Sequence, residues 1–500
     1  MSLVRRNVLA NTGGRVWAAV LSLAVVPLQI RFVGIEAYGL LGVFQSLIAV
    51  FALLDLGLGN VLNRELARAS MQPGREQEMR NLVRTIEAAY WGIGVLIGIA
   101  VALLAAPIAE HWLQASALPR DQLVQALVLM GIAIACQWPR ALYYSGLMGL
   151  QSQVVTNVAS ASVSTVLSVG GVLILWKVSP SVTALLAWYA AVGLAETLLA
   201  AWLLWRALPA AKAPAAFSPD LLRDLWRYAA GMTGVSVMTV ILTQVDKIIL
   251  SRALSLEAFG YYSLASRVAA ALFYLIGPVT TAYFPRFSQL TAPEHREELA
   301  RTYHKGCQLM AVAVLPATAV LALFSAELLQ LWTHDPVLVA NCSAILAVLA
   351  LGNALNGVMG LPASLQFAHG WTRLVLVFNT CAVLLLAPLT WVMASRYGGL
   401  GAAGVWLVLN VGYVALMLRL MHKRLLPGQL GAWMGWDFAA PLAAAFAAAG
   451  LCKLLLPADA GPLGMAIAIA AAMGTSVLSA GFAAPDLRPA FARALRLRAA

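Results

Sequence analysis

The residues of this 500-residue chain that could do chemistry are a few charged side chains inside long apolar segments. An ionisable side chain at bilayer depth costs about 2.5–3.5 kcal/mol on insertion scales, so it is expected to face a cavity or a charged partner. Arginine grips phosphate through two parallel hydrogen bonds, and a carboxylate binds and releases a proton or Na⁺. The seven residues are Arg15, Asp55, Arg140, Glu196, Asp246, Lys247 and Arg267.

The arginines favour the binding of an anion, but each also has a structural interpretation. Arg267 lies near mid-depth of its segment, so it either lines a central cavity or forms an ion pair. Arg140 precedes Tyr143 and Tyr144, which fits either a cavity wall or a buried packing cluster. Arg15 either faces the cavity or reaches the cytoplasmic headgroups. These five residues are the candidate substrate-binding set.

The acids at bilayer depth are candidates for ion coupling. A coupled transporter needs a carboxylate that binds H⁺ or Na⁺ in one state and releases it in another, and Asp55, Glu196 and Asp246 have the required chemistry. The alternative is structural pairing, of Asp246 with Lys247 or Arg267, or of Glu196 with Arg267. For Asp55 the structural interpretation is favoured.

The composition requires a lipid environment for most of the chain. Hydrophobic residues make up 61% of it and charged residues only 11%, whereas soluble domains carry roughly 25% charged residues. The apolar residues form blocks long enough to cross a bilayer, which takes about 20 residues each. The sequence therefore predicts an all-α polytopic membrane protein. Fourteen spans are expected near residues 10–31, 38–62, 84–106, 123–148, 155–177, 183–206, 228–251, 258–283, 305–325, 339–363, 373–395, 400–420, 436–456 and 462–483.

The net charge of +12 does not indicate nucleic-acid binding, because the charges lie between the apolar blocks as topology signals do. The six histidines lack metal-ligand spacing and the five cysteines lack paired spacing, so no metal, disulfide or cofactor is expected. No GxxxxGK[ST] loop is present, so the chain is not expected to hydrolyse nucleotide itself.

Lys and Arg set the expected orientation. With a cytoplasmic N-terminus, 23 of the 33 basic residues fall on the inner face and six on the outer face. This bias predicts that both termini are cytoplasmic. The tail 486–500 is either an amphipathic helix on the inner leaflet or a frayed basic end.

The chain also resembles itself at a shift of 221 residues. Gly13 then aligns with Gly234, and Gly39 with Gly260. Each repeated unit holds six spans, an even number, so both units enter the bilayer in the same direction. The predicted plan is two six-helix lobes related by a parallel repeat, with a site between them and two extra C-terminal helices.

Two charged pairs repeat with this shift at the outer hairpins. Arg31 and Glu36 align with Arg252 and Glu257. Because they repeat, these residues are interpreted as gate or hairpin-closing pairs more than as substrate contacts.

The predicted domain organisation has five parts. They are an N-terminal six-helix lobe at 1–206, a cytoplasmic linker at 207–227, a C-terminal six-helix lobe at 228–425, an extra helix pair at 426–485 and a basic tail at 486–500.

Four segments of the chain carry a family resemblance. They are residues 26–39 (VPLQIRFVGIEAYG), 54–59 (LDLGLG), 149–151 (GLQ) and 397–405 (YGGLGAAGV). In this order they resemble bacterial polysaccharide flippases, of the O-antigen or exopolysaccharide type. These belong to the multidrug/oligosaccharidyl-lipid/polysaccharide exporter superfamily.

The resemblance implies a transporter and not an enzyme. It implies that a polyprenyl-diphosphate-linked oligosaccharide is moved from the cytoplasmic to the periplasmic leaflet of a bacterial inner membrane by alternating access. It also implies coupling to Na⁺ or H⁺ as in an antiporter, a membrane-lipid environment, and polysaccharide assembly proteins as partners. The glycan, the coupling ion and the oligomeric state are not given by the sequence.

Two alternatives differ in class. A cation-coupled multidrug exporter of the same superfamily would favour an acid-dominated cavity, whereas four cations face three acids at membrane depth here. A membrane polysaccharide polymerase would need paired acids on a long periplasmic loop to activate a sugar hydroxyl, and the connections are short.

The first prediction concerns topology. Reporter fusions after residues 70, 215, 292 and 425 should report the cytoplasm, and fusions near 115, 333 and 459 the periplasm. A periplasmic signal from the C-terminus would show that one of the last two spans is miscounted.

Overall fold

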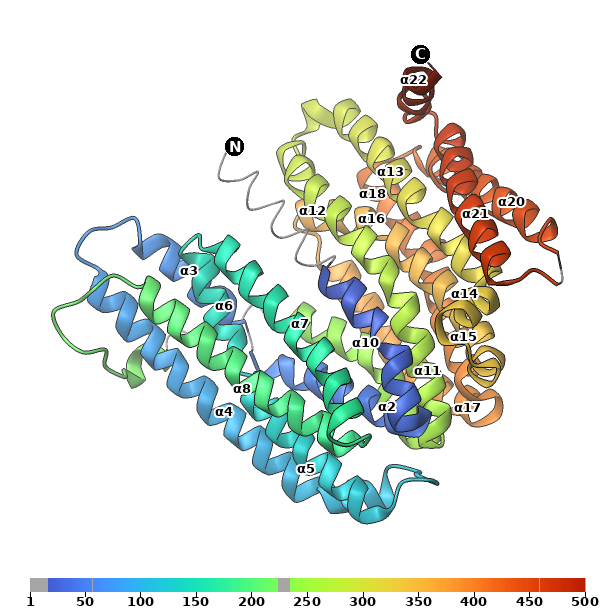
Figure 1. Cartoon of the computed structure of the whole chain (residues 1–500). Helices are drawn as coiled ribbons and strands as arrows, with labels where there is room; N and C mark the ends of the chain where they lie inside the picture. Colours follow the sequence, from blue (N-terminus) through green and yellow to red (C-terminus); the bar gives the residue numbers. More distant parts are fainter. Residues whose placement is uncertain (1–16, 56, 224–233, 458, 500) are drawn as a thin grey trace. The chain divides into compact units, whose positions relative to one another are not determined.

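The structure is a computed structural model, and its described residues are almost entirely helical (Figure 1). One isolated bridge, between Gln114 and Ser255, is the β pairing found in them. The chain divides into two compact units, Met1–Gly260 and Tyr261–Ala500. The described residues are 17–55, 57–223, 234–457 and 459–499.

The first unit is built around three long helices, α4, α5 and α8, which pack side by side (Figure 1). Its core includes the fully buried side chains of Leu62, Val83, Tyr90, Leu147 and Leu204, contributed by four different helices. The helices are α2 (Val26–Phe51), η1 (Ala52–Asp55), α3 (Leu58–Ala69), α4 (Glu76–His111), α5 (Arg120–Gln137), α6 (Arg140–Gly149), α7 (Gln153–Lys177), α8 (Val182–Ala207) and α10 (Gly234–Ala253).

In the second unit, α13 packs against α15 and also against the C-terminal pair α20 and α21. The helix α11 (Leu256–Ala269) begins in the first unit and continues into the second. The other elements are η2 (Ala270–Leu272), α12 (Phe273–Gln289), η3 (Pro293–His295), α13 (Arg296–Leu323), α14 (Ser325–Thr333), α15 (Pro336–Val358), α16 (Gly360–Ala368), α17 (Arg373–Gly412), η4 (Tyr413–Met417), α18 (Leu418–Leu425), α19 (Leu430–Ala432), η5 (Trp433–Ala439), α20 (Ala440–Leu454), α21 (Pro462–Ala483) and α22 (Arg488–Ala499).

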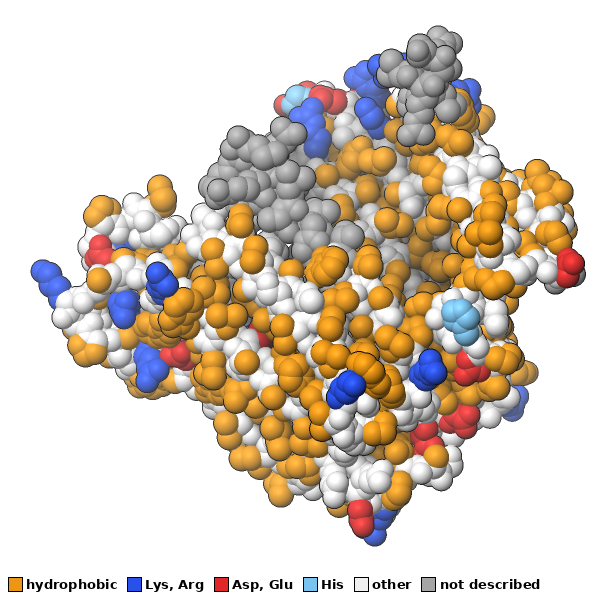
Figure 2. Space-filling view, viewed as in Figure 1, with side chains coloured by type: hydrophobic (Ala, Val, Ile, Leu, Met, Phe, Trp, Pro, Cys, Tyr) orange, Lys and Arg blue, Asp and Glu red, His pale blue; other side chains and the backbone are white. Residues whose placement is uncertain are grey.

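The surface of the protein is apolar, as a lipid-facing surface must be. Leu103, Leu384 and Leu454 are among many large hydrophobic side chains that lie more than two thirds exposed. Hydrophobic side chains cover most of the face drawn in Figure 2. Within the described residues, eleven helical segments are long and apolar enough to cross a membrane. The chain is therefore a multi-pass, all-α membrane protein.

The eleven segments differ from the fourteen predicted spans where two helices join without a loop and where two predicted spans lie partly outside the described residues. The segment Arg373–Leu425 covers two predicted spans, and Gly398 interrupts it with φ 61° and ψ −148°. Gly34 interrupts α2 in the same way, with φ 83° and ψ 165°. Both backbone conformations lie where a Cβ is disfavoured, so glycine makes a sharp bend in place of a loop. The first and seventh predicted spans lie partly outside the described residues.

The boundary between the compact units falls at Gly260 and not in the predicted linker 207–227. One reason is that α10, predicted to open the second lobe, packs against α2 within the first unit. The two six-helix lobes remain a prediction.

The tail is helical from Arg488 to Ala499, and Phe491 packs against Gly481 and Phe482.

Two glycines of the repeat approach the backbone of each other's helix in a reciprocal way. A Cβ on Gly39 would collide with the carbonyl oxygen of Leu256, and one on Gly260 with that of Ile35. The shift of 221 residues that aligns Gly39 with Gly260 also aligns Ile35 with Leu256. The contact is therefore reciprocal, as the predicted parallel repeat would require.

The second prediction follows from this contact. Gly39→Ala and Gly260→Ala should each lower the thermal unfolding temperature of the detergent-solubilised protein, because a backbone carbonyl cannot move aside as a side chain would. Overpacking of this kind costs about 1–3 kcal/mol. The control is Gly92→Ala in α4, where a Cβ meets nothing within 4 Å and alanine improves helix propensity. An equal effect of all three substitutions would contradict the close approach.

Candidate functional site

The site assembles in the first unit around a cavity of about 310 Å³. Side chains from α2, η1, α4, α5 and α6 reach it. The cavity therefore contains one of the predicted acids and one of the predicted arginines. Its lining residues are Ile48, Ala52, Asp55, Tyr90, Ile134, Gln137, Trp138, Arg140 and Ala141.

A break between two helices places Arg140 at the cavity. The helix α5 ends at Gln137 and α6 begins at Arg140, with Trp138 and Pro139 between them. Proline has no N–H to donate and fixes φ, so it readily begins a helix but does not continue one. The Trp138 indole donates to the carbonyl of Phe51, which fixes the break against the end of α2.

Arg140 forms an ion pair with Glu196 of α8. Its Nη1 donates to Glu196 Oε2 at 2.7 Å, and the Tyr144 hydroxyl donates to Glu196 Oε1 at 2.8 Å. The Glu196 side chain is 8% exposed and that of Arg140 is 35% exposed. The sequence left open whether Arg140 lines a cavity or belongs to a buried cluster, and in the structure it does both. Glu196 therefore pairs with Arg140 and not, as one alternative had it, with Arg267.

The hydroxyls of the two tyrosines that follow Arg140 donate hydrogen bonds to different carboxylates. The Tyr143 hydroxyl donates to Glu87 Oε1 at 2.7 Å and accepts from the Trp91 indole at 3.0 Å. Glu87 also accepts from the Trp205 indole and forms an ion pair with Arg84. Sequence reasoning missed Glu87, although it stands only three residues inside a predicted span. Such an acid at the edge of a span is the signal that could have found it.

Asp55 is held by backbone amides. Its carboxylate accepts hydrogen bonds from the amides of Gly57 and Gly59, at 3.2 and 3.3 Å, and from the Tyr90 hydroxyl. Gly57 has a φ of 82°, in the left-handed region that glycine tolerates, and this turns the chain back over the carboxylate. These contacts are with amides and a hydroxyl and not with a cation, so the role of Asp55 stays a prediction.

Asp246, Lys247 and Arg267 are not among the residues that line this cavity. Lys247 donates to the carbonyl of Thr243 in its own helix, at 3.1 Å, and Asp246 is half-buried. Arg267, in the last turn of α11, is half-buried, and its Nε has no hydrogen-bond partner among the described residues. Arg15 lies outside the described residues.

The two hairpins predicted to lie on the outer face are closed differently from the prediction. Glu36 is buried and accepts from the amides of Ser116 and Ala117, at 2.7 and 2.8 Å. Arg31 is exposed, and the described part of the chain shows no ion pair between it and Glu36. The expected pairing is corrected on this point, because loop amides satisfy the buried carboxylate at close range.

The same loop also closes the second hairpin. The guanidinium of Arg252 lies 5.2 Å from the centre of the Trp112 ring, and the side chain of Gln114 donates to the carbonyl of Arg252 at 2.9 Å. The Gln114 carbonyl accepts from the amide of Leu256 at 2.8 Å. Glu257, the predicted partner of Arg252, belongs to the first turn of α11. Across the described residues, no group of three His, Cys, Asp or Glu side chains is placed to hold a metal.

The fold is that of a class of multi-pass membrane transporters. A solved lipid II flippase, MurJ in an inward closed conformation, matches it with a TM-score of 0.74 at 13% identity, over 95% of this chain and 98% of that one. The MATE multidrug transporter DinF-BH, in complex with R6G, matches with a TM-score of 0.60 at 14% identity, over 84% and 95%.

The sequence comparisons name the family. The family described as "Polysaccharide biosynthesis protein" matches residues 4–291, more than half of the chain, and the MatE family matches residues 232–392. A Shigella flexneri protein named "Putative O-antigen transporter" is 21% identical over 85% of this chain and 99% of its own length. The chain belongs to the polysaccharide biosynthesis protein family, within the superfamily expected from its motifs. It is a transporter and not an enzyme, which excludes the polymerase alternative.

The third prediction concerns the Arg140–Glu196 pair. Arg140→Gln and Glu196→Gln should each lower the thermal unfolding temperature more than the double substitution does, because each single change leaves a charge without its partner. Breaking a buried pair costs about 3–5 kcal/mol, and partial exposure of Arg140 places the expected cost below that range. The exposed outer pair Arg120–Glu110 is the control, and its disruption should cost about 1 kcal/mol or less. Additive losses in the Arg140–Glu196 cycle would contradict the pairing.

Proposed function

We propose that this protein moves a polyprenyl-diphosphate-linked oligosaccharide from the cytoplasmic to the periplasmic leaflet of a bacterial inner membrane, for the biosynthesis of a cell-surface polysaccharide. Its family, its O-antigen transporter relative and its likeness to a lipid II flippase support a lipid-linked glycan as substrate. The observation that carries the proposal is a guanidinium, that of Arg140, on the wall of a cavity at membrane depth.

Arg140 is suited to the diphosphate of such a substrate. A guanidinium has five N–H donors, and in the structure one of its nitrogens, Nη1, donates a hydrogen bond to Glu196. About a third of the side chain is exposed, so other donors can meet an anion that enters the cavity. The cavity volume of about 310 Å³ is at the lower end of ligand sites, which suits the headgroup phosphates but not a whole oligosaccharide. The glycan therefore requires the cavity to open, as in alternating access.

The same geometry gives a route to ion coupling. A phosphate that binds Arg140 competes with Glu196 for the guanidinium. Release of Glu196 from Arg140 would then be linked to substrate binding, and Glu196 stays a candidate for the coupling ion. Asp55 and Asp246 remain the other coupling candidates, and Na⁺ is the alternative to H⁺.

The rest of the predicted machinery fits the same cycle. Arg15, Tyr143, Tyr144 and Arg267 would complete the anion and sugar contacts. The predicted lobes, 10–206 and 228–420, would rock against each other with both termini in the cytoplasm. Polysaccharide assembly proteins would supply and receive the glycan.

Export of a drug or organic cation is the second candidate. The match of the MatE family to residues 232–392 and the MATE-like fold favour it. Two assays distinguish these functions. A glycan flippase restores surface polysaccharide to a deletion strain, whereas a drug exporter raises drug resistance when it is overproduced.

The fourth prediction tests the arginine at mid-depth. Arg267→Ala should abolish surface glycan while membrane abundance stays near normal, because the substitution also removes the cost of burying a charge. One charge-assisted contact to phosphate is worth roughly 1.5–3 kcal/mol, or tenfold and more in affinity. Arg267→Lys should recover only part of the export, since an ammonium cannot form the bidentate contact.

Membrane abundance by immunoblot and surface glycan are measured side by side for both variants. The control is Arg396→Ala, which removes an exposed charge and should change neither. A purely structural Arg267 would give the opposite order, with low abundance for the alanine variant and recovery by lysine. Normal abundance with normal export in Arg267→Ala would overturn its place in the substrate site.

A further inference from the structure

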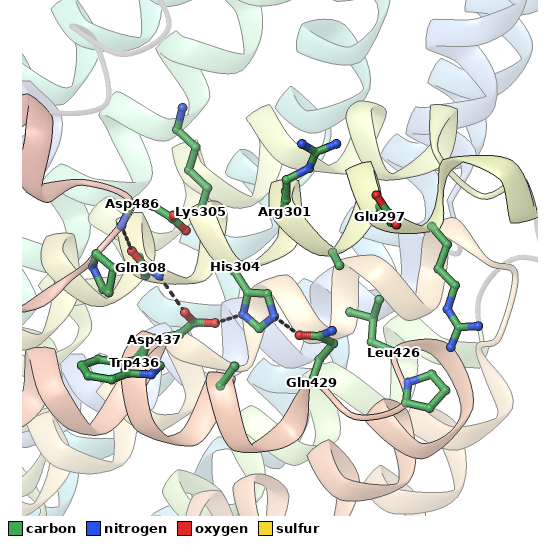
Figure 3. Close-up of a pocket in the computed structure, with 15 residues that line it drawn as sticks. Glu297, Arg301, His304, Lys305, Gln308, Leu426, Gln429, Trp436, Asp437 and Asp486 are labelled. Carbon is green, nitrogen blue, oxygen red and sulfur yellow. Dashed lines mark hydrogen bonds and ion pairs between the residues drawn. The ribbon is translucent and has the colours of Figure 1, made fainter.

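The second unit contains a larger cavity, of about 840 Å³, that the proposed transport cycle does not use (Figure 3). It lies where α13 begins, where α18 ends and where η5 runs toward α20. The turn at Pro485 and Asp486, after α21, also reaches it. Both α13 and η5 belong to segments that cross the membrane, so the cavity lies at an end of two spans.

The floor of this cavity is a closed hydrogen-bond network. The two ring nitrogens of His304 face Asp437 Oδ2 at 2.5 Å and Gln429 Oε1 at 3.0 Å (Figure 3). Gln308 donates from Nε2 to Asp437 Oδ1 at 3.0 Å, and its Oε1 accepts from the amide of Asp486 at 2.8 Å. Asp437 is 2% exposed and Gln308 is 3% exposed, so the floor is buried.

The charges of the floor cancel. Two acceptor oxygens facing one imidazole suit the doubly protonated ring, which donates from both nitrogens. In that form the positive ring neutralises Asp437, and the floor does not repel an anion. With a neutral ring, the carboxylate of Asp437 would leave the floor with one negative charge.

The mouth of the cavity carries the cations. Arg296, Arg301 and Lys305 come from the first turns of α13, and none of them forms an ion pair among the described residues. Figure 3 shows Arg301 and Lys305 side by side, directed away from the floor. Glu297 and Asp486 also line the cavity, so the three cations and these two acids leave a net charge of one positive. This charge lies beside the N-terminus of α13, which is the positive end of the helix.

An exposed aromatic side chain indicates the depth in the membrane at which the mouth of the cavity lies. Trp436 lines the cavity and is 57% exposed, next to the buried Asp437. Exposed tryptophan concentrates where hydrocarbon meets the headgroups, because the ring is apolar and the indole N–H is polar. The cations and the tryptophan therefore lie where a phospholipid has its phosphate and the start of its acyl chains.

We propose that this cavity binds the phosphate headgroup of an anionic phospholipid of the phosphatidylglycerol or cardiolipin type. Basic pockets between spans at a membrane surface recognise such headgroups. A surplus of one positive charge suits a phosphodiester with one negative charge better than a diphosphate. The site is separate from the Arg140 cavity and does not depend on the proposed substrate.

The test compares two double substitutions with the same charge change and spacing. Arg301→Gln with Lys305→Gln removes two cations of the mouth. The control, Arg419→Gln with Lys423→Gln, removes two exposed cations four residues apart that do not line the cavity. Native mass spectrometry of the purified full-length protein, titrated with phosphatidylglycerol, gives the affinity of the tightest retained lipid. The mouth variant should bind about tenfold or more weakly than wild type, and the control like wild type.

Three comparisons decide whether the proposal holds. Equal binding of the lipid by the mouth variant and the control would overturn the site, and equal retention of phosphatidylcholine would overturn recognition of headgroup charge. Inorganic phosphate should not displace the lipid at millimolar concentration, and displacement would show a free-anion site instead. If the double variant does not fold, the single substitutions Arg301→Gln and Lys305→Gln, both at exposed positions, should each weaken binding about threefold to fivefold, and unchanged binding in both would overturn the proposal.

Discussion

Hydrocarbon offers no partner to a charged or polar group, and this constraint organises the interior of the protein. The buried carboxylates of Glu36, Glu87 and Glu196 each find donors on segments distant in sequence. In lipid, apolar faces gain little by meeting one another, because acyl chains are equally apolar, so polar contacts specify which helices adjoin. The Arg140–Glu196 pair, for example, determines how α6 stands against α8.

The close approach of Gly39 and Gly260 brings two helices of the first unit together at their backbones. Each glycine lets the carbonyl of the other hairpin come nearer than any side chain would permit. The loop through Gln114 then completes the hydrogen bonds at the same end of the unit. This loop therefore contacts both of the helices that the two glycines bring together. This explains why Glu36 binds the loop at Ser116 and not the arginine of its own hairpin.

The class of protein and the approximate spans could be predicted from the sequence, because hydropathy is a local property. The bends at Gly34 and Gly398 were expected as connections between separate spans, and Arg140 was expected inside one continuous span, 123–148. The partners of the charges could not be predicted, since Arg140 and Glu196 are 56 residues apart and Glu36 and Ser116 are 80 apart. Neither hydropathy nor periodicity contains information on which distant element satisfies a buried group. His304 was likewise judged only by metal-ligand spacing, whereas its partner Asp437 lies 133 residues away.

The same reasoning accounts for the attachment of the last helices, whose role the sequence leaves open. Ion pairs hold α20 and its leading turn η5 near both ends, Asp437 with His304 of α13 and Lys453 with Glu327 of α14. Lys453 also lies over the ring of Phe324, 5.2 Å from its centre. Between these points the helix presents mostly alanine, which packs closely but gives little preference for protein over lipid. Because these two ion pairs add to the packing of α20 against α13, α20 must follow α13 and α14 in any motion that keeps both pairs intact. The lipid cavity at the Asp437 end would then move with the second unit and hold a fixed relation to its spans.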